Sequence, residues 1–210
     1  MVIADQQRCG RGRQGRSWYS PAEENLYFSV VLRPPLLPRQ APPIALVAAV
    51  ATADAIAALG VAPDLKWPND VLLEGRKVAG ILTEMATTRE AIDFVVVGVG
   101  VDLNNLQFPP ELVDRATSVR RVLGHPVNRS DFAAELCARL EYWYDRLVVE
   151  GPAPLAAAWK KRSRLLGRTV TVDGGREQIR GVAEDLDDEG ALLLRTEEGR
   201  LLKVLAGEII

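Results

Sequence analysis

The pattern of hydrophobic residues changes sharply near residue 166, and this change constrains the fold more than any other feature of the sequence. Before it, long apolar segments alternate with polar loops over most of the 210 residues. After it, short apolar runs are separated by Asp/Gly and Glu/Gly turns, about five strands in roughly forty-five residues, which is typical of a small barrel. The sequence therefore predicts two domains, residues 1–165 and 166–210.

The first part carries clear strand signals. Residues 25–34 are aromatic and β-branched and end at two prolines, which predicts a strand. Residues 71–86 form two apolar runs about a turn at 74–76, the pattern of a β-hairpin. Residues 91–105 are apolar on both expected faces, so they are predicted to form a central strand.

Helix signals occupy the rest of this part. Residues 43–59 begin at a proline and are followed by glycine, which predicts a helix. Because Thr52 and Asp54 interrupt it, this apolar stretch is expected to be a buried helix and not a membrane span. Ser130 is predicted to cap a long helix that reaches about residue 149, and a further helix is predicted over residues 154–166.

The composition excludes several classes of protein. A net charge of -2 argues against a protein whose main task is to coat nucleic acid. One histidine and two widely spaced cysteines give no metal-ligand pattern and no disulfide framework. No signal peptide is recognisable at the N-terminus. A cytoplasmic protein that binds neither nucleic acid nor membrane is expected.

The segment CGRGRQGRSW, residues 9–18, is the first candidate site. Its glycines satisfy G-x-G-x-x-G, but a strand follows where a dinucleotide-binding fold needs a helix. Arginine–glycine segments that bind RNA are usually longer and lie on basic proteins. A solvated surface loop is the plainest alternative. Ordering so many glycines costs about 1–2 kcal/mol per residue, and an anionic ligand held by arginines could offset that cost.

This loop and three further segments occur in a fixed order. They are GRGRQGR (10–16), KWPND (66–70), AGILTE (79–84) and GVGVDLN (98–104), and ATSV follows at 116–119. In this order they resemble the motifs of the biotin–protein ligases, and the tail is similar to that family's SH3-like C-terminal domain. The resemblance covers nearly the whole chain. It implies an α+β fold of the class II aminoacyl-tRNA synthetase/biotin ligase type, with a mixed sheet, helices mainly on one face and a C-terminal SH3-like barrel.

The resemblance also implies a reaction. In that family the carboxylate of biotin attacks the α-phosphorus of ATP to give biotinyl-5'-AMP, and a lysine of a biotin carboxyl carrier domain then takes the biotin. A carboxylate is already ionised at neutral pH, so the first step needs fixed cations and not a general base. Biotin, ATP and Mg²⁺ are thus the implied ligands, with no protein metal ligands to name. Relatives often form homodimers.

Site residues follow from the resemblance, motif by motif. Lys66 corresponds to a lysine that contacts the biotin carboxylate and the α-phosphate, and Arg13 to the residue that retains the adenylate. These two are the implied catalytic residues. The implied biotin and adenylate contacts comprise, in addition, Gln7, Gly10, Arg11, Gly12, Arg16, Trp18, Asn69, Gly80, Gly98, Gly100 and Asp102. Trp18 could equally pack beneath the closed loop.

The sequence departs from the family at three places. A Ser-Thr-Asn/Ser segment that usually contacts biotin is absent, so either a truncated start or a shortened variant is expected. The usual asparagine of the GxGxN strand end is Asp102. No N-terminal DNA-binding domain is expected, so a repressor role is not implied. A lipoate or octanoyl ligase, a non-catalytic ligand- or RNA-binding module, and an inactive ligase-like fold stay open as alternatives.

Overall fold

The computed structural model describes residues 1–88, 90–175 and 177–210. The strands of the first part are β1 (Val2–Ala4), β2 (Leu26–Leu32), β3 (Asp64–Lys66), β4 (Asp70–Leu73), β5 (Arg76–Thr87) and β6 (Ile92–Val101). Its helices are α1 (Pro43–Ala57), α2 (Val119–Leu123), α3 (Arg129–Glu150) and α4 (Ala153–Arg162). The second part contains β7 (Thr169–Asp173), β8 (Gln178–Leu186), β9 (Leu192–Thr196), β10 (Leu201–Val204) and β11 (Glu208–Ile209).

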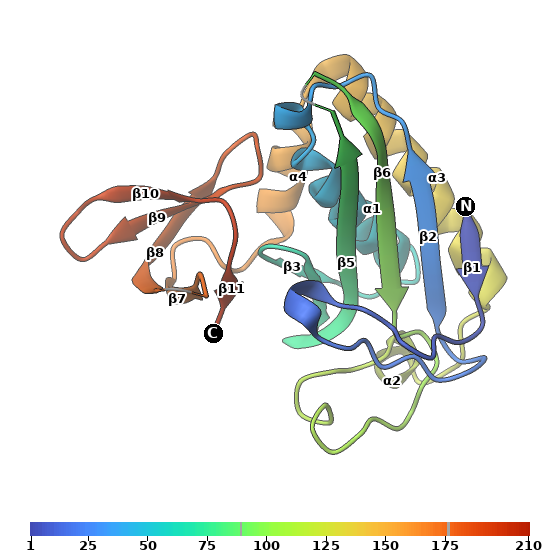
Figure 1. Cartoon of the computed structure of the whole chain (residues 1–210). Coiled ribbons are helices and arrows are strands. Elements are labelled where there is room, and N and C mark those ends of the chain that lie inside the picture. The colour runs from blue at the N-terminus through green and yellow to red at the C-terminus, as the bar shows by residue number, and fades with distance from the viewer. Residues whose placement is uncertain (89, 176) are drawn as a thin grey trace.

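The first part is built on a six-stranded sheet in the order β1-β2-β6-β5-β4-β3. Every strand pair in it is antiparallel, so the predicted mixed sheet is wrong in this respect. The physical reason is the connections: β4, β5 and β6 follow one another through hairpins, which can only join antiparallel neighbours. The helices lie against one face of the sheet, as expected, and the other face stays open (Figure 1).

The central position predicted for β6 is confirmed, but its two faces differ. Val95, Val97, Val99 and Val101 are buried beneath the helices, and the alternate residues are only half-buried. Two glycines occupy the half-buried side, so the strand looks apolar throughout although one face is open. The apolar character of both faces therefore does not mean that both are buried, because glycine carries no side chain that reveals the environment of its face.

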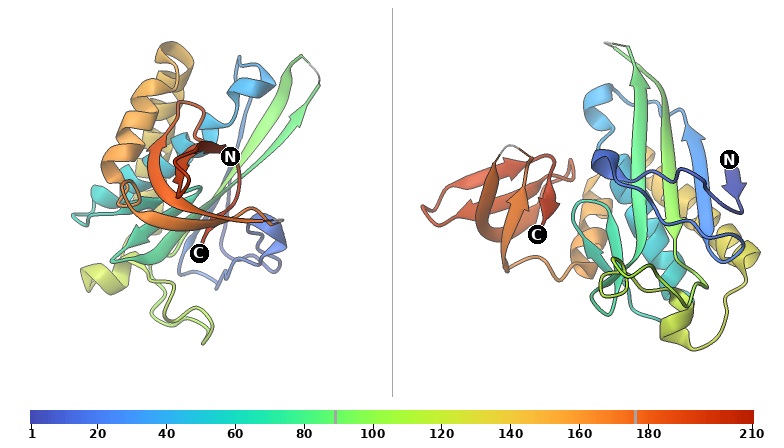
Figure 2. Two further views of the ribbon diagram at one scale, coloured as in Figure 1. Left: turned by 90° about the vertical axis from the view of Figure 1, so that its left-hand side faces the viewer. Right: turned by 60° about the horizontal axis from the view of Figure 1, so that its bottom comes forward.

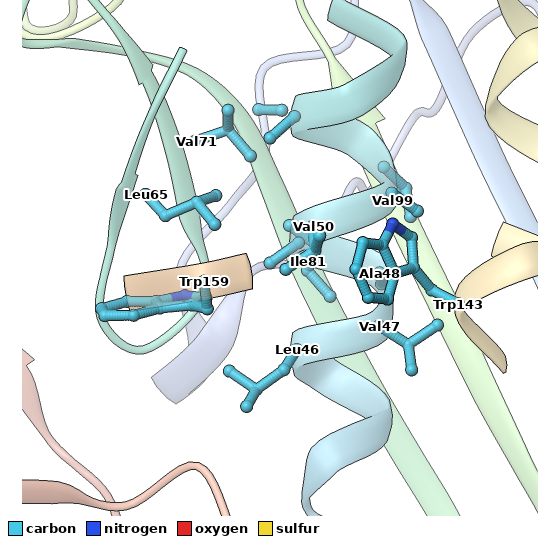
Figure 3. Packing of buried hydrophobic residues seen from close by; sticks show 14 of the residues in the cluster. Leu46, Val47, Ala48, Val50, Leu65, Val71, Ile81, Val99, Trp143 and Trp159 are labelled. Carbon is cyan, nitrogen blue, oxygen red and sulfur yellow. The ribbon is translucent and has the colours of Figure 1, made fainter. Parts of the chain in front are cut away.

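Helix α1 forms the centre of the core, between the sheet and helices α3 and α4. Figure 3 shows its Leu46, Val47 and Val50 among side chains of the sheet, with Trp143 of α3 and Trp159 of α4 on either side. The segment Pro38–Ala57 is long and apolar enough to cross a membrane, but 72% of its most apolar stretch is buried inside this molecule. The prediction of a buried core helix is confirmed.

The other two long helices differ from their predicted ends. Asn128, not Ser130, caps α3, and its side-chain oxygen accepts hydrogen bonds from the backbone N–H groups of Ser130 and Asp131 at 2.9 and 3.2 Å. Both residue types are good caps, so local sequence did not distinguish them. Helix α4 ends at Arg162, whereas the predicted helix continues to residue 166. Residues 163–166 belong to the segment that connects α4 to β7.

The second part is a five-stranded antiparallel sheet in the order β10-β9-β8-β7-β11, beside the first sheet (Figure 2). Polar contacts attach it to the first part, and two of them lie away from the glycine–arginine loop. The indole N–H of Trp67 donates to the carbonyl of Gly190 at 3.0 Å, and Lys160 pairs with Asp185 at 2.8 Å. Trp67 is buried, so the turn that follows β3 is held directly against the second domain.

Candidate functional site

A cavity of about 260 Å³ lies between the open face of the six-stranded sheet and the glycine–arginine loop of residues 10–16. The loop, which connects β1 to β2 in the chain, runs across that face in front of β6 and β5 (Figure 1). Residues 66–70 form a further wall, and Gly207 and Glu208 of the second domain complete it. Most of the predicted site residues line the cavity, namely Gln7, Arg11, Gly12, Arg13, Arg16, Trp18, Lys66, Asn69, Gly80, Gly98 and Gly100. Gly10 and Asp102 do not.

Backbone hydrogen bonds give the glycine–arginine loop a defined shape. The N–H of Gly12 donates to the carbonyl of Arg16 at 2.7 Å, and the N–H of Trp18 donates to that of Gly10 at 2.9 Å. Gly10 is buried, and a Cβ placed on it would lie 2.5 Å from the Trp18 carbonyl oxygen. Gly10 is therefore required by the packing of the loop itself, which explains its place outside the cavity lining.

Each arginine of the loop is paired with a different part of the protein. Arg13 donates to the Asn69 side chain at 3.2 Å, whereas the exposed Arg11 lies 3.7 Å from Glu84 of β5. Arg16 forms an ion pair with Glu208 of β11. Burial lowers the pKa of Arg13, although a guanidinium stays charged in proteins. The loop thus brings fixed positive charge to the mouth of the cavity.

Two lysines, Lys66 and Lys77, also line the cavity. Lys66 ends β3, as its motif predicts. Lys77 was missed by the sequence analysis; its ammonium lies 2.6 Å from a carboxylate oxygen of Asp70 and 5.3 Å from the centre of the Trp18 ring. In a regular strand position 78 would share the cavity face with Gly80, and position 77 would lie on the opposite, helix-covered face. A register shift between β4 and β5 at Val71/Leu72 changes that alternation, as β-bulges do, and exposes Lys77 to the cavity.

The Trp18 ring lies on a floor of glycines. A Cβ added to Gly100 would lie 2.6 Å from the indole, and one added to Gly80 would lie 3.0 Å from it. At Gly98 an added Cβ would meet only atoms at 3.5 Å or more. The indole N–H of Trp18 is buried and has no hydrogen-bond acceptor among the described residues. Gly80 and Gly100 therefore make room for Trp18. Of the three glycines, only Gly98 has space for an added methyl group.

This difference between two glycines of β6 is testable. Gly100→Ala is expected to destabilise the protein by about 1–3 kcal/mol, because its methyl group forces the indole out of place. Gly98→Ala is the matched control and is expected to be neutral or stabilising by up to about 1 kcal/mol, since alanine is favoured over glycine in a strand. Urea unfolding of both variants gives the two values. Equal stabilities would contradict the tight contact at Gly100.

Asp102 lies behind the cavity wall, buried among polar groups. The side-chain amide of Asn25 donates to its carboxyl group at 3.0 Å, and the Asn25 oxygen accepts from the N–H of Leu103 at 2.8 Å. Burial raises the pKa of Asp102 well above its ordinary value, and the charge of Lys77 offsets only part of this. Asp102 thus ties the end of β6 to the start of β2, which differs from the expected ligand contact.

The raised pKa of Asp102 predicts how stability depends on pH. Its pKa is higher in the folded chain than in the unfolded one, so the folded state holds more protons and stability falls as pH rises above the ordinary aspartate value. Asp102→Asn keeps the shape and removes the ionisation. We expect this variant to be more stable than the parent at pH 8 by about 1–3 kcal/mol. At pH 5 the difference in stability should be smaller. Urea unfolding at both pH values tests this, and an unchanged difference contradicts it.

The cavity is suited to anions. Three guanidinium groups and two ammonium groups surround it, whereas the described residues contain no group of three or more side chains able to hold a metal, and no histidine among them lines the cavity. Cations fixed in a partly enclosed site stabilise negative charge without having to reorganise. The arrangement can therefore bind two anionic reactants and stabilise charge that develops between them.

Comparison with known families gives two matches. Residues 1–102 match the model described as the Biotin/lipoate A/B protein ligase family. Residues 165–210 match the Biotin protein ligase C terminal domain. The chain is also similar to a biotin--[acetyl-CoA-carboxylase] ligase from Paracoccus denitrificans, with 40% identity over 95% of this chain and 85% of that one.

Two further relatives extend this picture. The bifunctional ligase/repressor BirA of Bacillus spizizenii is 35% identical over the whole of this chain, which spans 65% of the length of that protein. Among solved structures, a biotin protein ligase from Aquifex aeolicus in complex with biotin and ATP superimposes with a TM-score of 0.88. It is 30% identical, and the match covers 99% of this chain and 86% of that one.

Proposed function

Since the chain belongs to the family of biotin protein ligases, we propose that it is an ATP-dependent biotin–protein ligase. The observation that carries this proposal is the convergence of Lys66, Lys77 and Arg13 on one cavity. In the related Aquifex protein, the solved complex contains biotin and ATP. The proposed acceptor is a lysine of a biotin carboxyl carrier protein of a carboxylase, and the Paracoccus relative is named as a ligase that acts on acetyl-CoA-carboxylase.

The first proposed step joins two anions. An oxygen of the biotin carboxylate attacks the α-phosphorus of ATP, a new C–O–P linkage forms, and pyrophosphate leaves with the bonding electrons. Because the carboxylate is already ionised at neutral pH, no proton has to be removed. Lys66 and Lys77 are proposed to neutralise the carboxylate and the α-phosphate. Arg13 is proposed to hold the product, biotinyl-5'-AMP, from the side of the glycine–arginine loop. Each charge is fixed before the reactants arrive.

Mg²⁺ is proposed to enter with the phosphates of ATP. Magnesium typically binds one or two protein carboxylates together with substrate phosphates, and Asp70 is a carboxylate of the cavity lining that could take this part. When bound, the ion would supply charge neutralisation on the phosphate oxygens. Asp70 is paired with Lys77 in the structure, so it would also keep that ammonium in the cavity.

The second proposed step is the attack of an acceptor lysine amine on the acyl carbonyl, which forms an amide and releases AMP and a proton. The glycine–arginine loop is proposed to keep water away from the adenylate until then. We place the reaction in the cytoplasm, which is consistent with the free cysteines Cys9 and Cys137. A homodimer, and a domain boundary near residue 166, belong to the same proposal.

A pyrophosphate-release assay tests the proposal. With biotin, ATP and Mg²⁺, the purified chain should release pyrophosphate, and it should label a biotin carboxyl carrier domain with biotin. Lipoate and octanoate in place of biotin test the alternative ligases, and isothermal titration with biotin and with lipoate compares the affinities. Release that depends only on lipoate would overturn the choice of biotin. No release with any of these acids would favour a binding module or an inactive relative.

A further inference from the structure

We propose that Glu208 is a positioning residue of the second domain, and that it latches the glycine–arginine loop over the cavity by pairing with Arg16. The consequence for catalysis rests on the proposed function, but the latch itself does not. Arg16 is thereby reassigned from ligand contact to loop closure. Arg13 remains the loop arginine directed at the ligand.

The contact between Arg16 and Glu208 has the geometry of a specific latch. The two terminal guanidinium nitrogens of Arg16 donate to the carboxylate of Glu208, one to each oxygen, and the Nη1–Oε1 distance is 2.5 Å. Such two-pronged pairs fix orientation as well as distance. The pair joins residues 192 positions apart in sequence. It is the direct connection between the loop and the second domain, across the mouth of the cavity.

The carboxylate is held in place by the fold. Glu208 belongs to β11, which pairs with β7 opposite Asp173, and the next residue, Ile209, is buried in the core of the second domain. The hydrogen bond from Trp67 to Gly190 fixes that domain against the turn of residues 66–70. Glu208 is therefore a stationary anchor, and the loop that carries Arg16 is the part that can open.

Electrostatics give Arg16 a second task. Glu208 and Gly207 line the cavity. An unpaired carboxylate of Glu208 would repel an anionic ligand and would attract the lysines that are proposed to bind that ligand. The hydrogen bond from Arg16 lowers the pKa of Glu208, and the charges of Lys66 and Lys77 act in the same direction. When the latch is closed, Arg16 neutralises this carboxylate, so that Glu208 does not compete with the ligand for the charges of Lys66 and Lys77.

This arrangement predicts unequal effects of the two single substitutions. Glu208→Gln opens the latch but leaves no unpaired anion, so the KM for ATP should rise about threefold to fivefold. Arg16→Gln opens the latch and exposes the carboxylate of Glu208, so the KM should rise about tenfold or more. The double variant Arg16→Gln/Glu208→Gln should return to the smaller effect. A merely structural contact would give no such recovery.

Limited digestion with trypsin tests the latch without any catalytic activity. Trypsin cleaves after arginine, and the loop offers Arg11, Arg13 and Arg16. Glu208→Gln should raise the initial rate of cleavage after Arg11 and Arg13 about threefold to fivefold, the range of a partly exposed ion pair. The charge-swapped variant Arg16→Glu/Glu208→Arg should restore protection. Glu184→Gln, which breaks a surface pair with Arg195 in the second domain, is the control.

The two assays separate the two proposals. Faster cleavage in Glu208→Gln with no biotin-dependent pyrophosphate release in the parent would support the latch and reject the proposed function. Unchanged cleavage in Glu208→Gln would reject the latch even if the parent is an active ligase. Equal KM values for both single variants, without recovery in the double variant, would reject the neutralising task of Arg16.

Discussion

Lys66→Ala is expected to slow biotin-dependent pyrophosphate release by about 10²–10³-fold, the loss seen when one preorganised electrostatic contact to a transition state is removed. Lys66 lines the cavity at the end of β3, beside the turn that holds Asn69. The rate of the first step should fall more than the affinity for biotin, because charge at phosphorus grows during the reaction. Single-turnover pyrophosphate release, with isothermal titration of biotin, measures both.

Three comparisons make this result specific. Lys77→Ala should be at least as damaging, since it also leaves the Asp70 carboxylate without its cation inside the cavity. Lys77→Ala/Asp70→Asn should then recover part of the loss. Lys161→Ala removes an exposed lysine of α4 outside the cavity and should leave the rate unchanged. A Lys66→Ala rate within about threefold of the parent would remove this lysine from the proposed mechanism.

Arg13→Gly is expected to form the adenylate at nearly the rate of the parent but to release it into solution. Arg13 is half-buried, donates to Asn69 and lines the cavity in which the adenylate is proposed to form. Glycine removes that contact and adds backbone freedom worth about 1 kcal/mol. We expect the adenylate to appear in solution in amounts at least about tenfold above the parent, the effect of about 1.4 kcal/mol. Chromatography of the filtrate after ultrafiltration measures it.

Arg11→Gly is the matched control for this result. It adds the same backbone freedom to the same loop, but the guanidinium that it removes is mostly exposed and reaches only Glu84 at 3.7 Å. Release of adenylate should therefore rise clearly less than in Arg13→Gly. If both variants leak equally, loop flexibility alone accounts for retention and the assignment of Arg13 is wrong.

Much of the site was predictable from the sequence because its motifs are short and continuous. The loop of residues 10–16 and the KWPND turn each specify local backbone geometry, and the order of the motifs identified the family. The buried helix α1 was equally clear, since an apolar stretch of this length needs cover on every side. The change in strand length and turn frequency near residue 166 precedes the second sheet, which begins with β7 at Thr169.

The sequence alone determined the kinds of chemistry available: fixed cations, flexible glycines and almost no histidine. Only the tertiary structure decided which cation reaches which place. The register shift at Val71/Leu72 turned Lys77 into the cavity, and burial made Asp102 a structural group. Glu208 came to the loop from the far end of the chain. Local sequence could not reveal these three outcomes, because each depends on strand pairing or on domain packing between residues that are distant in the chain.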